Sequence, residues 1–141
     1  MAVRVKKSEY DLFLRCDTNT RGHTAWFYFK VDNKNQTGKV KFNICNFGKK
    51  KNLYAQGMKP YVLSNDEWRQ GDCYEVVWAE RLCRYGFDRK TFQLQFKYNF
   101  KEKNKPVYFA YSIPYTYSQL QNFITEATSK SARYIKSSKI C

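Results

Sequence analysis

Thr91-Phe-Gln-Leu-Gln-Phe-Lys-Tyr-Asn-Phe100 alternates strictly between polar and apolar side chains. Its apolar residues are Phe92, Leu94, Phe96, Tyr98 and Phe100, and its polar residues are Thr91, Gln93, Gln95, Lys97 and Asn99. A repeat of two residues is typical of a β-strand that buries one face and exposes the other to water. This stretch therefore predicts a strand on one side of a hydrophobic core.

Six other stretches also have the composition of strands. They are residues 10–16, 26–31, 39–46, 61–63, 73–79 and 107–113. Residues 39–46 alternate cleanly, so we again expect one face in the core and one in water. Residues 26–31 have large side chains on both faces, which predicts a central strand, and the polar residues 32–38 are expected to form a hairpin connection after it.

The residues after Pro114 predict a helix of about three turns. Its apolar side chains at helical spacing are Leu120, Phe123, Ile124 and Ala127. Ser118-x-x-Gln121 matches a capping box for its first turn. Strands at intervals of roughly ten residues, with turn signals between them, are typical of an antiparallel sandwich or barrel. The sequence thus predicts a mostly β domain with one C-terminal helix.

Composition limits the class of protein. The 141 residues are enough for one domain with its own core. The net charge of +14, from 26 basic and 12 acidic residues, attracts anionic partners. The five cysteines are odd in number and show no CxxC spacing, so we expect reduced thiols in a cytosolic protein. No run approaches the roughly 18 apolar residues of a membrane span.

Residues suited to catalysis are scarce. His23 is the only histidine, and there is no HxxE or HExxH motif that would supply a pair of metal ligands. No glycine-rich phosphate-binding motif is present either. We therefore expect no catalytic residue, metal site or cofactor in this chain alone.

Basic side chains cluster in two loop regions. They are Lys49, Lys50 and Lys51 in the first, and Arg81, Arg84, Arg89 and Lys90 in the second. Together they are candidates for a patch that attracts an acidic partner. Aromatic residues interleave with basic ones, as in proteins that bind single-stranded nucleic acid, although most of these aromatics lie on apolar strand faces. An independent nucleic-acid-binding β-domain is therefore the alternative interpretation.

Several stretches, taken in order, resemble the N-terminal domain of the cytosolic carboxypeptidases. They are Trp26-Phe-Tyr-Phe-Lys-Val-Asp-Asn33, Val40-Lys-Phe-Asn-Ile-Cys-Asn46, Leu53-Tyr54, Gly57-Met-Lys-Pro60, Trp68-Arg-Gln-Gly71 and Tyr108-Phe-Ala-Tyr-Ser-Ile-Pro-Tyr-Thr-Tyr-Ser118. The last of these is similar to the most distinctive signature of that domain. The resemblance extends from Tyr10 to Ala127.

The resemblance implies an antiparallel β-sandwich of about seven to nine strands with one C-terminal helix. The sandwich would span residues 10–128, after an N-terminal extension at residues 1–9. Residues 129–141 would form a tail that leads to a carboxypeptidase domain outside this chain. That domain would supply the HxxE motif, a later histidine, a substrate-binding arginine, a general-base glutamate and the zinc.

The resemblance also implies partners and a location. The family removes glutamates from protein tails such as those of tubulin, so we expect a cytoplasmic protein and consider microtubule association. We expect the corner at Pro114, Tyr115, Thr116 and Tyr117 to face the partner domain. If it does, these residues should be exposed, or paired with a second copy, in a structure of this chain alone.

Overall fold

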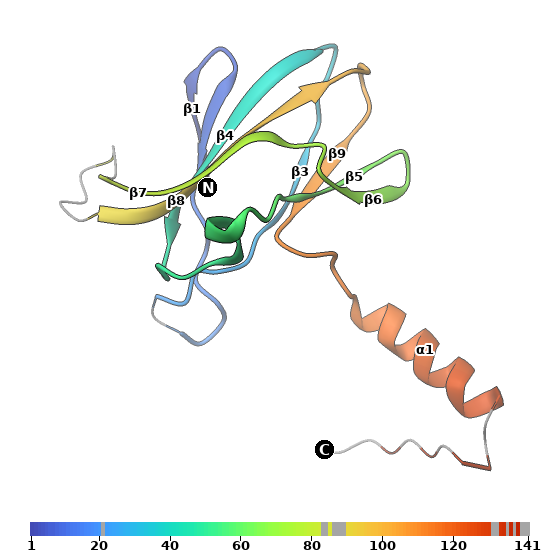
Figure 1. Ribbon diagram of the computed structural model, residues 1–141. Helices are drawn as coiled ribbons and strands as arrows, with labels where there is room; N and C mark the ends of the chain where they lie inside the picture. The colour runs from blue at the N-terminus through green and yellow to red at the C-terminus, as the bar shows by residue number, and fades with distance from the viewer. Residues whose placement is uncertain are drawn as a thin grey trace.

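The computed structural model describes residues 1–20, 22–82, 85, 90–130, 133, 134, 136 and 138. Its elements are β1 (Ala2–Lys6), β2 (Glu9–Leu12), β3 (Tyr28–Val31), β4 (Gly38–Phe47), the 3-10 helix η1 (Leu53–Gln56), β5 (Tyr61–Ser64), β6 (Glu67–Gln70), β7 (Tyr74–Leu82), β8 (Lys90–Phe100), β9 (Val107–Ala110) and α1 (Tyr117–Lys130). Figure 1 shows a body of strands from which α1 projects. The predicted β-rich fold with one helix near the C-terminus is confirmed, with nine strands among the described residues.

The strands form two sheets of unequal width. One sheet has the order β1-β2-β4-β8-β7, and the other has the order β3-β9-β5-β6. Neighbouring strands are antiparallel apart from β2 and β4, which run parallel. The Asn46 side chain continues this pairing beyond β2, because it accepts a hydrogen bond from the Leu14 N–H (2.7 Å) and donates one to the Leu14 carbonyl (3.0 Å).

The core is an aromatic cluster centred on Phe109 of β9, which is 0% exposed. Its ring centroid lies 5.1 Å from that of Phe29 in the same sheet, 5.3 Å from Phe42 in β4 and 5.2 Å from Tyr98 in β8. The cluster confirms the apolar face predicted for residues 91–100, since Leu94 and Phe96 are also fully buried. Aromatic side chains bury large apolar areas, so this cluster is the main contact between the sheets.

The predictions for residues 26–31 and 32–38 are wrong in part. β3 lies at the edge of its sheet, next to β9 alone, and the large side chains on its outer face belong to a surface instead of a second core layer. Residues 32–37 join β3 to β4 in the opposite sheet, so they form a connection between sheets and no hairpin. Asn33 fixes this connection, since its Oδ1 accepts a hydrogen bond from the Lys105 N–H.

The predicted polar faces of β4 and β8 are partly buried. Asn43 in β4, and Gln93 and Gln95 in β8, are each less than a tenth exposed, where the alternating pattern predicted side chains in water. Both strands are long and paired on both sides, so neighbouring side chains of the same sheet cover their centres. Alternation alone does not reveal this coverage.

Two strands were not predicted from the sequence. β1 pairs with β2, so the sheet already begins at Ala2, within the residues 1–9 that we expected to precede the sandwich. β6 pairs with β5 through a tight turn, and its outward side chain Trp68 lies opposite Leu63. Both strands are short, at five and four residues, and β6 is largely polar, which hides their pattern.

The Phe109 cluster leads to a stability prediction. Phe109→Ala should lower the free energy of unfolding by about 3–5 kcal/mol, because it leaves a cavity between the sheets. The exposed Tyr117→Ala should change the free energy of unfolding by no more than about 0.5 kcal/mol. Urea unfolding followed by far-UV circular dichroism measures both. Equal effects of the two substitutions would show that Phe109 does not hold the sheets together.

Cysteine burial leads to a second prediction. Cys16 is exposed, whereas Cys73 is fully buried, and this burial strongly raises the pKa of the Cys73 thiol. Because the thiolate is the reactive species, iodoacetamide at pH 8 should modify Cys16 in the folded chain and Cys73 only in urea. Peptide mapping by mass spectrometry separates the two sites. Modification of Cys73 at the rate of Cys16 in the folded chain would contradict the structure.

Candidate functional site

The corner that follows β9 begins with residues fixed to the sandwich. The Tyr111 ring meets the Tyr54 ring edge-on at 5.3 Å, and its hydroxyl donates a hydrogen bond to Asn52 Oδ1 (3.3 Å). Burial strongly raises the pKa of the Tyr54 phenol, so this phenol stays neutral. Trp26 Nε1 donates a hydrogen bond to Ser112 Oγ at 3.1 Å. The chain therefore leaves the core at a defined place.

Beyond Ser112 the corner is exposed. Tyr115 is 65% exposed and Tyr117 is 75% exposed, while Pro114 is half-buried. The exposure expected for the chain alone is thus present at these two tyrosines. A capping box does start the helix, but its residues are Thr116 and Gln119, two positions before the predicted pair: Thr116 Oγ1 accepts from the Gln119 N–H, and Gln119 Oε1 accepts from the Thr116 N–H.

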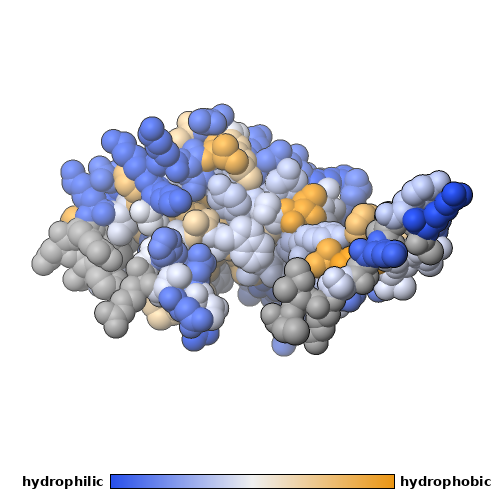
Figure 2. Space-filling view, turned by 90° about the horizontal axis from the view of Figure 1, so that it is seen from below, coloured by the Kyte–Doolittle hydropathy of each residue, from blue (hydrophilic) through white to orange (hydrophobic). Residues whose placement is uncertain are grey.

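The helix α1 has an apolar side that no described strand covers. None of its residues is buried, and Phe123 is 61% exposed. Leu120 is also exposed, and Ile124 is half-buried. Figure 2 shows hydrophobic residues where the sandwich gives way to the helix, on a face that is otherwise largely hydrophilic. An uncovered apolar surface of this kind is typical of an interaction site.

A second exposed surface lies on the outside of the four-stranded sheet, and we name it the outer aromatic face: Trp26, Tyr28, Trp68 and Tyr108. The Tyr28 ring stacks on the Tyr108 ring at 5.9 Å and lies 6.3 Å from the rings of Trp26 and Trp68. Lys30 Nζ lies 5.9 Å from the centre of the Tyr108 ring. The signal in the sequence was the second set of large side chains in residues 26–31, which we assigned to a core.

The Trp26–Ser112 hydrogen bond joins this face to the corner. Trp26 and Tyr28 are each nearly half exposed, although aromatic side chains gain most when buried. The outer aromatic face therefore adjoins the corner, and the exposed apolar side of α1 follows the corner along the chain.

The predicted basic patch is only partly described. Lys49, Lys50 and Lys51 are exposed, and the Lys50 carbonyl accepts a hydrogen bond from Trp78 Nε1 (3.2 Å), which places their loop against β7. Arg81 at the end of β7 and Lys90 at the start of β8 are exposed and lie one register step apart. Arg84 and Arg89 lie outside the described residues. The structure thus brings the lysine loop to the strand that carries Arg81.

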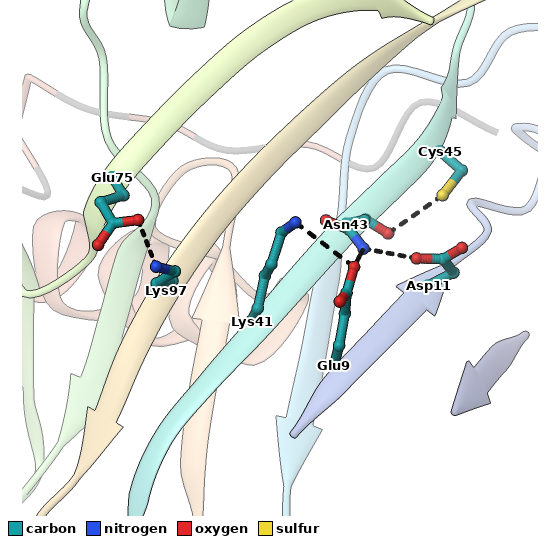
Figure 3. A network of polar contacts seen from close by, with 7 residues as sticks. All are labelled: Glu9, Asp11, Lys41, Asn43, Cys45, Glu75 and Lys97. Atoms are coloured by element: carbon teal, nitrogen blue, oxygen red, sulfur yellow. Dashed lines mark hydrogen bonds and ion pairs between the residues drawn. The ribbon is translucent and has the colours of Figure 1, made fainter. Parts of the chain in front are cut away.

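A polar layer lies on the outer face of the five-stranded sheet (Figure 3). Asn43 Nδ2 donates hydrogen bonds to Asp11 Oδ1 (2.6 Å) and Glu9 Oε1 (3.0 Å), and Lys41 Nζ lies 3.4 Å from Glu9 Oε1. Asp11 and Asn43 are each 1% exposed. Glu9 and Asp11 lie on β2 and Asn43 lies on β4, so this buried amide stabilises the contact between the two parallel strands.

Metal-binding groups do not converge among the described residues. No three His, Cys, Asp or Glu side chains in this part of the chain come together as a metal site, so these residues do not fit zinc. His23 is exposed in the connection between β2 and β3. Of the described helices, none has the length and hydropathy needed to cross a membrane.

Comparison with known proteins places the chain in a family. Residues 1–112 match the model of the cytosolic carboxypeptidase N-terminal domain. Human cytosolic carboxypeptidase 6 is 34% identical over 133 residues, which cover 93% of this chain and 26% of the relative. Cytosolic carboxypeptidase 6 of Caenorhabditis elegans is 37% identical over 134 residues, with 90% and 27% covered. The chain thus spans about a quarter of the length of these relatives.

The fold has a solved counterpart. A metallo-carboxypeptidase from Burkholderia cenocepacia superposes with a TM-score of 0.58 at 15% identity, over 90% of this chain and 30% of that chain. At this identity the similarity concerns the fold alone. The match to the family model and the identity to these relatives show that this chain belongs to the family of cytosolic carboxypeptidase N-terminal domains.

Proposed function

We propose that this chain is the non-catalytic accessory domain of a cytosolic zinc carboxypeptidase, and that it docks the carboxypeptidase domain. The observation that carries this proposal is the family match over residues 1–112 in a chain that spans about a quarter of its relatives. The zinc and the catalytic residues would belong to the remaining three quarters. The parent enzyme would remove glutamates from acidic protein tails such as those of tubulin, in the cytoplasm and in association with microtubules.

The docking surface in this proposal is the exposed apolar region around the corner. Pro114, Tyr115, Thr116 and Tyr117 form its centre, and the outer aromatic face and α1 flank it. Exposed tyrosine and tryptophan side chains suit an interface because they bury a large area and still hydrogen-bond at its rim. Docking would cover the apolar side of α1 that no described strand covers.

A chimera tests the docking. In the chimera, the present chain replaces the matching segment of human cytosolic carboxypeptidase 6, over which the two align for 133 residues. Replacing Tyr115 and Tyr117 together by serine should lower the free energy of unfolding of the chimera by about 2 kcal/mol, because two partly buried rings are lost. The same two substitutions should lower the free energy of unfolding of the isolated chain by no more than about 0.5 kcal/mol.

Tyr134→Ser is the matched control, since Tyr134 is 82% exposed and lies outside the corner. This substitution should leave the free energy of unfolding of both proteins unchanged. Urea unfolding of the isolated chain and the chimera gives the values. If the corner substitutions cost both proteins the same, the corner is not the docking surface.

The basic patch has a role in the same proposal. Lys49, Lys50, Lys51, Arg81 and Lys90, together with Arg84 and Arg89 outside the described residues, would attract the acidic tail toward the active site. A net charge of +14 favours such encounters over distances of about one Debye length, near 10 Å at 0.1 M salt. This contribution should therefore disappear as the salt concentration rises.

A peptide titration tests the recruitment. The chain should bind a fluorescent peptide of ten glutamates in 20 mM salt and should release it in 300 mM salt. Lys49→Gln, Lys50→Gln and Lys51→Gln together should weaken the binding in 20 mM salt about tenfold. The control Lys34→Gln, Lys101→Gln and Lys103→Gln removes the same charge from loops at the opposite end of the sandwich (Figure 1) and should have a smaller effect. Fluorescence anisotropy measures both.

The same titration, repeated with an oligonucleotide, distinguishes recruitment of an acidic tail from the alternative function, binding of single-stranded nucleic acid. The outer aromatic face beside Lys30 also suits the stacking of bases from single-stranded nucleic acid. Oligothymidylate that binds more tightly than the acidic peptide and quenches tryptophan fluorescence would favour an independent nucleic-acid-binding domain. If the two triple lysine variants weaken peptide binding equally, the binding reflects only the net charge of the chain, and the basic patch has no specific role in recruitment.

A further inference from the structure

The sandwich is open along one side. A groove of about 760 Å³ lies between the edge strand β3 and the inner face of β2 and β4. Its lining includes the apolar side chains of Tyr10, Leu12, Phe29, Val31 and Val40, all of which remain partly exposed although they pack against the core.

The unequal width of the sheets explains the groove. Phe42 of β4 lies opposite Phe29 of β3, with ring centroids 5.7 Å apart, and it also contacts Phe109 of β9. Because β3 is the last strand of its sheet, β2 and β1 extend beyond it on the other sheet. The inner side chains of β2 therefore have no opposing strand among the described residues. The groove has the position of a missing fifth strand.

The backbone of β3 can accept such a strand. The Phe27 carbonyl accepts a hydrogen bond from the Tyr111 N–H, at the start of the ladder between β3 and β9. Alternation in an antiparallel ladder then turns the N–H and carbonyl groups of Tyr28 and Lys30 toward the open edge. An edge with unpaired backbone groups is a template for a further strand.

The charges around the groove select the occupant. The lining contains the cations Lys7, Arg15, Lys30 and Lys39 and the carboxylates Asp17 and Asp32. Lys30 pairs with Asp32 at 2.9 Å, which leaves an excess of positive charge at the rim. The groove therefore favours an acidic segment with apolar side chains at alternate positions, since alternate residues of a strand point to the same side.

We propose that the β3 groove binds an extended acidic peptide, which adds as a strand to the free edge of β3 and inserts alternate apolar side chains beside Tyr10 and Leu12. This binding mode is strand addition, in which backbone hydrogen bonds supply affinity and side-chain pockets supply specificity. It differs from attraction of a polyglutamate tail by the basic patch, because a run of glutamates has no apolar side chains for the groove.

A designed probe tests the inference on the 141-residue chain. The probe is a fluorescent, end-blocked octapeptide of alternating glutamate and valine. One control peptide alternates lysine and valine, and another has the same composition in two blocks of four residues. The alternating acidic peptide should bind most tightly, and its binding should shift the amide resonances of Tyr28 and Lys30 in spectra of the labelled chain.

Two substitutions locate the site. Lys30→Pro removes an N–H from the open edge and should weaken binding about fivefold more than Lys30→Gln, which removes only the charge. Val40→Trp fills the groove with an apolar side chain and should also weaken binding. The site can therefore still be tested if Lys30→Pro fails to fold. Arg69→Gln, in β6 at the far edge of the same sheet, should leave binding unchanged.

Three outcomes would overturn the inference. The first is equal binding of the alternating and blocked acidic peptides, which would indicate attraction of charge alone. The second is undiminished binding to the folded Val40→Trp chain. The third is a dimer of the free chain in sedimentation that Val40→Trp dissociates, which would show that a second copy occupies the groove.

Discussion

The packing of Phe109 against rings from both sheets is the contact on which the rest of the molecule depends. β9 lies between β3 and β5, and its inward side chain contacts Phe42 and Tyr98 of the opposite sheet. The position of β3 at the edge follows from its pairing with β9, and so does the groove beside it. The chain also leaves β9 directly for the exposed corner, so this strand sets the direction in which the apolar surface faces.

Three surfaces of different chemistry follow from this arrangement. The outside of the four-stranded sheet carries stacked aromatics that continue into the corner through the Trp26–Ser112 hydrogen bond. The outside of the five-stranded sheet carries a polar layer in which Asn43 bridges Asp11 and Glu9. The open side between the sheets is apolar with a basic rim. Uncovered apolar surfaces of this kind are typical of interaction sites.

The sequence predicts the strands whose polar and apolar side chains alternate. It does not predict the features that depend on which strands lie side by side. The pattern of residues 91–100 identifies β8 and its buried face because a repeat of two residues is visible within one segment. The edge position of β3 and the burial of Asn43 depend on which strands pair, and no local pattern contains that information. The exposure of Tyr115 and Tyr117 was expected from the family resemblance, whereas the outer aromatic face was missed because large side chains on both faces of a strand also fit a central position.

In the proposed function, a carboxypeptidase domain covers the corner and the outer aromatic face. Hydroxyl-radical footprinting measures this coverage most directly, by comparing the oxidation of Trp26, Tyr115 and Tyr117 in the isolated chain and in the chain joined to such a domain. These side chains should be strongly protected in the joined protein, while the oxidation of Tyr134 should stay unchanged. Equal oxidation of the corner in the two proteins would contradict the proposed coverage.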